Sequence, residues 1–141
     1  MQITRRDALT LGAGALTLAA LPMPVFAATA DVDAAIAEFT GGAEMGADGI
    51  ILTAPEIAEN GNTVPIEVSA PGAAAIMVLA TGNPTPKVGT INFGPLAAAQ
   101  FASTRIRLAG TQDVMAIARM QDGSFVQASA EVKVTIGGCG G

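Results

Sequence analysis

The 141-residue sequence contains no histidine, tryptophan or tyrosine, and only one cysteine. Without histidine, the chain lacks the side chain that most often serves as a general base or as a metal ligand near neutral pH. One thiol cannot supply the several ligands that a zinc or iron–sulfur site needs. No cofactor-binding motif is visible either. The composition therefore predicts no resident metal and no cofactor, and it disfavours an enzyme.

Positive charge is also scarce. The chain has seven Lys and Arg residues and twelve Asp and Glu residues, which gives a formal net charge of −5. This excess of negative charge argues against nucleic acid as a partner, since phosphate backbones select basic surfaces. Aromatic residues make up 4% of the chain and hydrophobic residues 50%. A core must therefore be built from aliphatic side chains, and the length suits a single domain.

Residues 1–30 have the features of an export signal. Arg5 and Arg6 form a twin-arginine pair, and the apolar stretch that follows is interrupted by glycine and closed by proline. It is too short and too weakly apolar for a comfortable membrane span. Small residues offer cleavage after Ala27 or Ala30. We predict export to the periplasm by the twin-arginine pathway, with no membrane attachment after cleavage; an uncleaved anchor and a Sec signal with a chance arginine pair are the alternatives.

Residues 31–136 are predicted to form one domain that is mostly β. A short helix is expected over residues 31–39, capped by Asp31 or Asp33 and stopped by Gly41 and Gly42. Strands are expected from alternating or continuous apolar residues, and Asp122 with Gly123 signals a hairpin turn. The expected strands are residues 64–68, 76–79, 104–108, 114–120, 125–128 and 132–136. About seven short strands without a second helix favour an all-β fold, an immunoglobulin-like antiparallel β-sandwich.

The sequence ends in a glycine-rich segment that surrounds the single cysteine, Cys139. The segment consists of Gly137, Gly138, Cys139, Gly140 and Gly141. Glycine leaves the backbone without side-chain restraint, so we expect residues 137–141 to form a flexible arm. Five residues extend at most about 3.3–3.6 Å each, which gives the thiol a reach of roughly 15 Å beyond the last strand.

The Cys139 thiol has no predicted activator. A free cysteine has a pKa near ~8.5, and no Lys or Arg lies within about five residues of Cys139. A catalytic cysteine needs a base or a positive neighbour. The pattern therefore predicts a thiol that other proteins modify. An intermolecular disulfide and an incidental tail residue are the alternatives.

Two other groups of polar residues are weaker candidates. Glu56, Glu59 and Asn60 form either an acid–base pair or a solvated turn between strands. Arg105 and Arg107 alternate along one expected strand, where they meet either an anion, an acidic partner or solvent.

Several segments together resemble the SoxY family of sulfur-oxidation proteins. These are the twin-arginine leader, residues 55–61 (PEIAENG), residues 64–65 (VP), residues 83–86 (NPTP), the strand of residues 104–107 (TRIR), and residues 132–141 (VKVTIGGCGG). The resemblance extends over almost the whole chain, and the terminal motif is the most specific part. Ala8 stands where twin-arginine signals often carry phenylalanine.

The resemblance implies a covalent sulfur carrier with an immunoglobulin-like sandwich. It implies that Cys139 is the attachment point and that Gly137, Gly138, Gly140 and Gly141 give the arm its reach. It also implies a heterodimer with a leaderless SoxZ-like subunit, which explains folded-state export of a protein without a cofactor. A c-type cytochrome, a hydrolase and a sulfur dehydrogenase are the implied processing partners.

Two other classes of function stay open on the sequence. A ubiquitin-like sulfur carrier also ends in Gly-Gly, but it acts in the cytoplasm through its terminal carboxylate, which disagrees with the leader and with Cys139. A structural or adhesive exported β-domain would use Cys139 only for an intermolecular disulfide.

Overall fold

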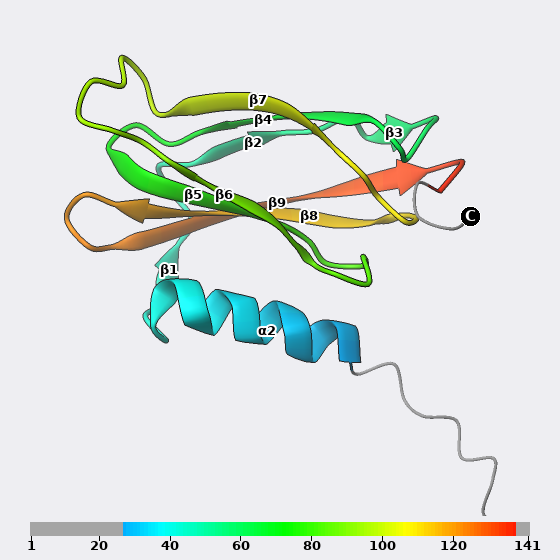
Figure 1. Cartoon of the computed structure of the whole chain (residues 1–141), viewed down its shortest axis with the longest axis horizontal. Coiled ribbons are helices and arrows are strands. Elements are labelled where there is room, and N and C mark those ends of the chain that lie inside the picture. The colour runs from blue at the N-terminus through cyan, green and yellow to red at the C-terminus, as the bar shows by residue number, and fades with distance from the viewer. Residues whose placement is uncertain (1–26, 138–141) are drawn as a thin grey trace, which may run out of the picture.

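The computed structural model describes residues 27–137; residues 1–26 and 138–141 lie outside the described part of the chain. Figure 1 shows two β-sheets packed face to face, with one helix against the outer face of the larger sheet. The elements within the described residues are α2 (Ala27–Thr40), β1 (Met45–Gly46), β2 (Ile51–Thr53), β3 (Ile57–Ala58), β4 (Val64–Ser69), β5 (Ala73–Ala80), β6 (Lys87–Asn92), β7 (Phe101–Ile106), β8 (Gln112–Met120) and β9 (Phe125–Val134).

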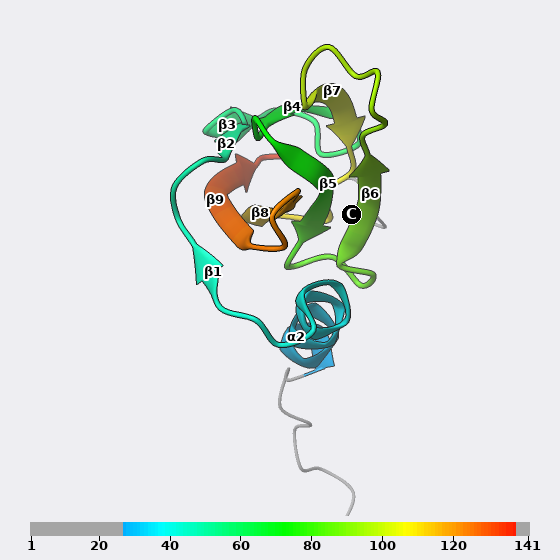
Figure 2. The ribbon, with the colours of Figure 1, turned by 90° about the vertical axis from the view of Figure 1, so that its left-hand side faces the viewer.

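The larger sheet has the strand order β1-β9-β8-β5-β6, and β3 also pairs with β9. The smaller sheet has the order β2-β4-β7. The long strands pair in antiparallel fashion, while the two-residue strands β1 and β3 run parallel to the two ends of β9. Seen from the end in Figure 2, the sheets enclose the core and α2 lies outside the larger one. The predicted all-β, immunoglobulin-like sandwich is confirmed.

The main core lies between the two sheets and is aliphatic. In β4, Val64, Ile66 and Val68 are buried while Pro65 and Glu67 are exposed, which is the alternation that the sequence predicted. Ile76 and Val78 of β5 face the same core from the opposite sheet. Burying such a side chain stabilises the fold by about 1.5–3 kcal/mol. The near absence of aromatic residues is therefore compensated by many well-packed aliphatic ones.

A second, smaller core lies between the larger sheet and α2. Met77 and Leu79 of β5 and Ile117 of β8 are fully buried there, and Val32 of α2 packs against them. Phe39 closes one end of this layer, with its ring centroid 5.9 Å from that of Phe125. The strand β5 is thus covered on both faces, as its continuous apolar run predicted.

Several local predictions need correction. The helix α2 runs from Ala27 to Thr40, so Asp31 and Asp33 lie inside it and cannot cap its start. It does end at Gly41 and Gly42, which both have positive φ. Residues 125–128 and 132–136 were expected as separate strands, but β9 runs unbroken from Phe125 to Val134, because it pairs with β8 from Gln112 to Arg119. Within residues 27–137, no helix has the length and hydrophobicity needed to cross a bilayer.

Candidate functional site at the base of the C-terminal segment

The strand β9 leads directly into the segment that carries the single cysteine. We call residues 133–137 the arm root, since they connect the sandwich to residues 138–141. Figure 1 shows the end of β9 beside β3. The arm root is therefore the part of the described chain that determines where the cysteine-bearing segment starts.

Residues 56–61 hold the arm root through a ladder of backbone hydrogen bonds. The Lys133 N–H donates to the Glu56 carbonyl (2.9 Å), and the Thr135 N–H donates to the Ala58 carbonyl (3.1 Å). Beyond the end of β9, the Gly61 N–H donates to the Ile136 carbonyl (2.7 Å). The root is consequently anchored as far as the residue that precedes Gly137.

Two threonine hydroxyls extend this anchoring. The Thr135 Oγ1 donates to the Glu59 carbonyl (2.9 Å), and the Val134 N–H donates to Thr111 Oγ1 (3.0 Å). The Leu108 N–H donates to the Gly61 carbonyl (2.8 Å) and ties the same block to the segment after β7. Segments far apart in the sequence therefore converge on the arm root.

A buried pair of amide side chains, Asn83 and Gln112, braces the same end of the sandwich. Asn83 Nδ2 donates to the Arg107 carbonyl (2.8 Å), while its Oδ1 accepts from the Ala109 N–H (2.8 Å) and from Gln112 Nε2 (2.9 Å). Gln112 Oε1 in turn accepts from the Gly82 N–H (2.9 Å). Both side chains are buried, and all their polar atoms have hydrogen-bond partners. They therefore fix the β5–β6 loop (residues 81–86) and the β7–β8 loop (residues 107–111) relative to β8.

The predicted site residues fall partly inside and partly outside this arrangement. Cys139, Gly138, Gly140 and Gly141 lie outside the described residues, and Gly137 is half-buried at the end of the arm root. Their roles as attachment point and flexible arm stay predictions.

The Glu56–Gly61 block does not behave as a simple solvated turn. Its side chains at Glu56 and Glu59 are exposed, but its backbone forms β3 and bonds to the arm root. The Asn60 side chain accepts from the Asn62 N–H (2.9 Å), which shapes the turn into β4. The block thus contributes backbone groups to the candidate site.

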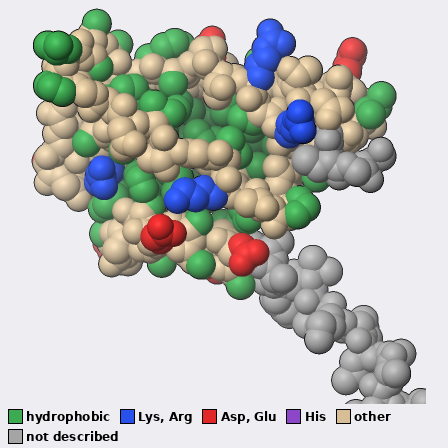
Figure 3. All heavy atoms as spheres, in the orientation of Figure 1, with side chains coloured by type: hydrophobic (Ala, Val, Ile, Leu, Met, Phe, Trp, Pro, Cys, Tyr) green, Lys and Arg blue, Asp and Glu red, His purple; other side chains and the backbone are tan. Residues whose placement is uncertain are grey.

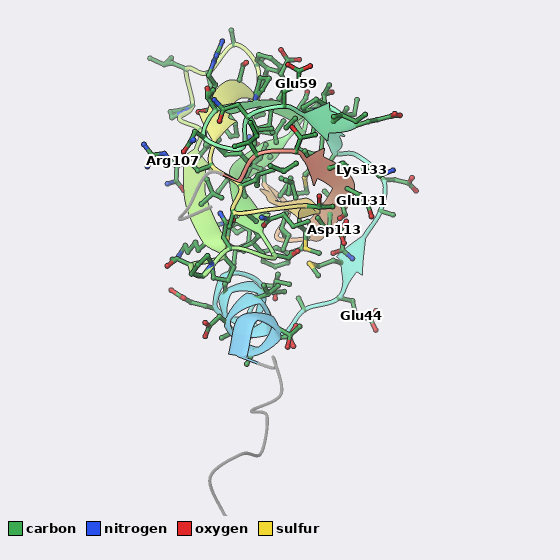
Figure 4. The ribbon with its side chains drawn as sticks, turned by 90° about the vertical axis from the view of Figure 1, so that its right-hand side faces the viewer. Glu44, Glu59, Arg107, Asp113, Glu131 and Lys133 are labelled. Atoms are coloured by element: carbon green, nitrogen blue, oxygen red, sulfur yellow. The ribbon has the colours of Figure 1, made fainter. Side chains whose placement is uncertain are left out.

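Charged side chains at this end lie on two sides. Asp113 is opposite Glu131 in the pairing of β8 with β9, and Lys133 follows Glu131 on the same face of β9. Figure 4 labels Arg107 on one side of the molecule and Glu131 with Lys133 on the other. The guanidinium of Arg105 lies 3.5 Å from Thr63 Oγ1. Within the described residues, no three His, Cys, Asp or Glu side chains are close enough to hold a metal ion.

The roles of Thr111 and Gln112 were not predicted from the sequence. Thr111 accepts from the Val134 N–H 23 residues away and Gln112 accepts from the Gly82 N–H 30 residues away, and hydrophobic periodicity cannot identify such distant partners. Asn83 stands in a segment that the family resemblance singled out, although the residue pattern alone predicted only a turn.

The fold and the arm root define a class of protein, a β-sandwich with a terminal segment anchored at one end. The family model for the sulfur oxidation protein SoxY matches residues 36–139, a range that includes Cys139. The chain belongs to the SoxY family.

A solved structure of the sulfur carrier protein SoxY from Chlorobium limicola is 34% identical to this chain. The match covers 77% of this chain and 99% of that one, with a TM-score of 0.66. A search of curated protein sequences finds no match.

More distant likenesses show the fold alone. A superoxide reductase (neelaredoxin) from Ignicoccus hospitalis is 21% identical, with 60% of this chain and 79% of that chain covered and a TM-score of 0.53. A putative superoxide reductase from Thermotoga maritima is 18% identical, with 68% and 89% covered and a TM-score of 0.50. The sandwich is therefore shared by proteins of different function, and function must be argued from the site.

Proposed function

We propose that this protein is a periplasmic covalent sulfur carrier whose cargo is attached to Cys139. The observation that carries the proposal is the match to the SoxY family over residues 36–139, which spans both the anchored root and the cysteine. The Chlorobium protein to which the chain is similar is itself a sulfur carrier. Export by the twin-arginine pathway and pairing with a SoxZ-like subunit belong to the same proposal.

The arm root supports this function by giving the carrier segment a fixed starting point. Hydrogen bonds hold residues up to Ile136, and the residues after it are glycine apart from Cys139. The three residues from Gly137 to Cys139 span about 10 Å when fully extended. That length is enough for the thiol to enter a pocket of a neighbouring protein while the arm root stays in place. An anchored root with a short glycine arm limits the space that the thiol searches, which raises its effective concentration at a docked enzyme.

The chemistry is supplied by partner proteins. A c-type cytochrome takes two electrons as the Cys139 sulfur bonds to the outer sulfur of thiosulfate, and the thiol proton is released. A hydrolase then adds water across the terminal sulfur–sulfur bond, releasing sulfate and leaving a persulfide on Cys139. A sulfur dehydrogenase oxidises the remaining sulfane sulfur. The chain itself contains no histidine to act as a base, which fits a carrier that these enzymes act upon.

Intact-mass spectrometry tests the proposal. The unreduced wild-type protein, incubated with thiosulfate and the cytochrome partner, should gain the mass of a thiosulfate adduct that a reducing agent removes. The Cys139→Ala variant should gain none, although it should unfold at the same urea concentration as wild type. An adduct that persists in Cys139→Ala, or a wild-type protein found only as a disulfide-linked dimer, contradicts the carrier function.

A further inference from the structure

An open seam runs along one side of the sandwich, between the outermost strands of the two sheets. β6 is the last strand of the larger sheet and β7 is the last strand of the smaller one. Between them lies a mostly apolar cavity of about 380 Å³. It is lined by Val78, Val88, Ile91 and Ala102 together with Gly89 and the hydroxyl-bearing Thr90, Ser103 and Thr104. We call this region, residues 87–92 with residues 101–106 and the cavity between them, the seam.

Within residues 27–137, the two strand edges at the seam have no further strand to pair with. In antiparallel sheets, hydrogen-bonded and non-hydrogen-bonded pairs alternate. The Phe93 N–H bonds to the Ala74 carbonyl, so Thr90 and Asn92 of β6 direct their N–H and C=O groups away from β5.

The same alternation applies to the other edge of the seam. The Ala70 N–H bonds to the Gln100 carbonyl, so Phe101 and Ser103 of β7 direct their backbone groups away from β4. Two strand edges with free donors and acceptors therefore border one apolar groove, which is the arrangement that an added β-strand recognises.

The seam also lies on the basic side of an acidic protein. From Asp31 onward the chain has five basic and eleven acidic residues. Lys87 precedes Val88 on β6, and Arg105 and Arg107 lie at and just after the end of β7. Figure 3 shows Lys and Arg side chains around a hollow floored by hydrophobic ones.

The opposite side of the molecule has a different charge. Figure 4 places Arg107 on the side of β6 and β7, while three carboxylates, Glu44, Asp113 and Glu131, lie on the other side together with one cation, Lys133. A basic rim around an apolar groove is complementary to a strand that alternates apolar and acidic side chains.

We propose that the seam is the docking surface for an acidic edge strand of another protein chain, which pairs with β6 and fills the groove toward β7. This inference rests on the proposed function for the identity of that chain, the SoxZ-like subunit. The strand's apolar side chains replace water in the cavity, and its carboxylates lie near Lys87 and Arg107. Docking at the seam would leave the arm root accessible to other proteins, because neither residues 133–137 nor the Glu56–Gly61 block belongs to the seam.

Binding of the purified SoxZ-like subunit from the same organism tests the inference. Thr90→Pro removes an outward-facing N–H from β6 and, because it sits on an edge, leaves the β5–β6 ladder intact. It should weaken binding about tenfold or more. The double variant Lys87→Glu/Arg107→Glu should weaken binding by a similar factor at low salt and by less at high salt. Lys133→Glu on the opposite side is the matched control for the single variants Lys87→Glu and Arg107→Glu, because each of these three changes replaces one positive charge with one negative charge.

Hydrogen exchange in the complex gives a second readout. The amides of Thr90, Asn92 and Ser103 should become protected when the subunit binds, and thermal unfolding of the variants alone should show that each one is folded. Unchanged affinity in the seam variants, or protection at the β9 edge instead, overturns the seam as the docking surface. A wild-type chain that fails to bind the subunit at all overturns the proposed pairing as well, whereas covalent loading of Cys139 would be unaffected.

Discussion

The two ends of the sandwich are ordered in different ways. At one end, residues 121–124 form the turn of the β8–β9 hairpin. Asp122 Oδ1 accepts from the Ser124 N–H (2.8 Å) and from Ser124 Oγ (2.6 Å), and Gly123 supplies a φ of 88°. At the other end, the arm root is held by residues such as Glu59, which lies 76 positions from Thr135 in the sequence. The hairpin is a local structure, while the arm root depends on the whole fold.

This difference bears on how a carrier works. A carrier arm delivers its thiol reproducibly only if the arm root keeps its position. Here the arm root is held by hydrogen bonds to backbone groups of segments that are distant in the sequence. Because several segments hold the arm root together, a substitution in any one of them should also disturb the others. Changes at the hairpin end should stay local.

The largest expected effect comes from Asn83→Ala. This change leaves the Ala109 N–H and the Arg107 carbonyl without their buried partner and removes one of the two acceptors of Gln112 Nε2, which should cost about 3 kcal/mol of unfolding free energy. Urea denaturation measures the loss. The exposed Asn62, whose side chain makes none of these bonds, is the control, and Asn62→Ala should change stability by less than about 0.5 kcal/mol. Equal effects of the two changes would contradict a special role for the arm end.

The same contrast explains what the sequence predicted. Period-2 alternation identified Val64–Ser69, and the run at Ile76 identified the buried strand β5. The Asp122–Gly123 pair identified the hairpin because its geometry depends on adjacent residues. Each of these signals is local, and each was confirmed.

The features that escaped prediction depend on distant partners. β3 is two residues long and exists only because β9 lies beside it. β6 has an exposed, irregular pattern, since it is an edge strand with a register shift opposite Val78 and Leu79. The candidate site could be predicted as a cysteine on a glycine arm, but its anchoring by Glu56–Gly61 and Thr111 could not.

Gly123→Ala probes the hairpin end. The left-handed φ of Gly123 is unfavourable for alanine, whereas no atom lies within 4 Å of the added Cβ. The change should therefore cost about 1.5 kcal/mol through backbone strain alone. Gly110→Ala is the control, because Gly110 has no positive φ and equally open surroundings. In Gly123→Ala, amide hydrogen exchange should speed up near the turn and stay unchanged at Thr135. Faster exchange at both places would contradict the view that the hairpin is ordered locally.

Thr135→Val tests the arm root itself. Valine retains the shape and the strand preference of threonine but loses the hydroxyl that donates to the Glu59 carbonyl, so unfolding free energy should fall by about 1 kcal/mol. Amide exchange should accelerate at Thr135 and Gly61 and not at Ser124. Thr53→Val, on the exposed face of β2, is a matched control and should leave exchange at the root as it is in wild type.

The smallest expected effect is the pH dependence of the hairpin. The hydrogen bonds from the Ser124 hydroxyl and amide lower the pKa of Asp122 below its ordinary value of 3.8. Because the folded-state pKa is the lower one, the ionised carboxylate stabilises the fold above about pH 4, and this contribution disappears as the pH falls through the folded-state pKa. Asp122→Asn keeps an oxygen acceptor and removes the charge. The stability difference between wild type and Asp122→Asn should therefore narrow in acid, and exchange at the arm root should not follow that change. A difference that stays constant from about pH 5 to about pH 2 would show that the charge of Asp122 contributes nothing to the turn.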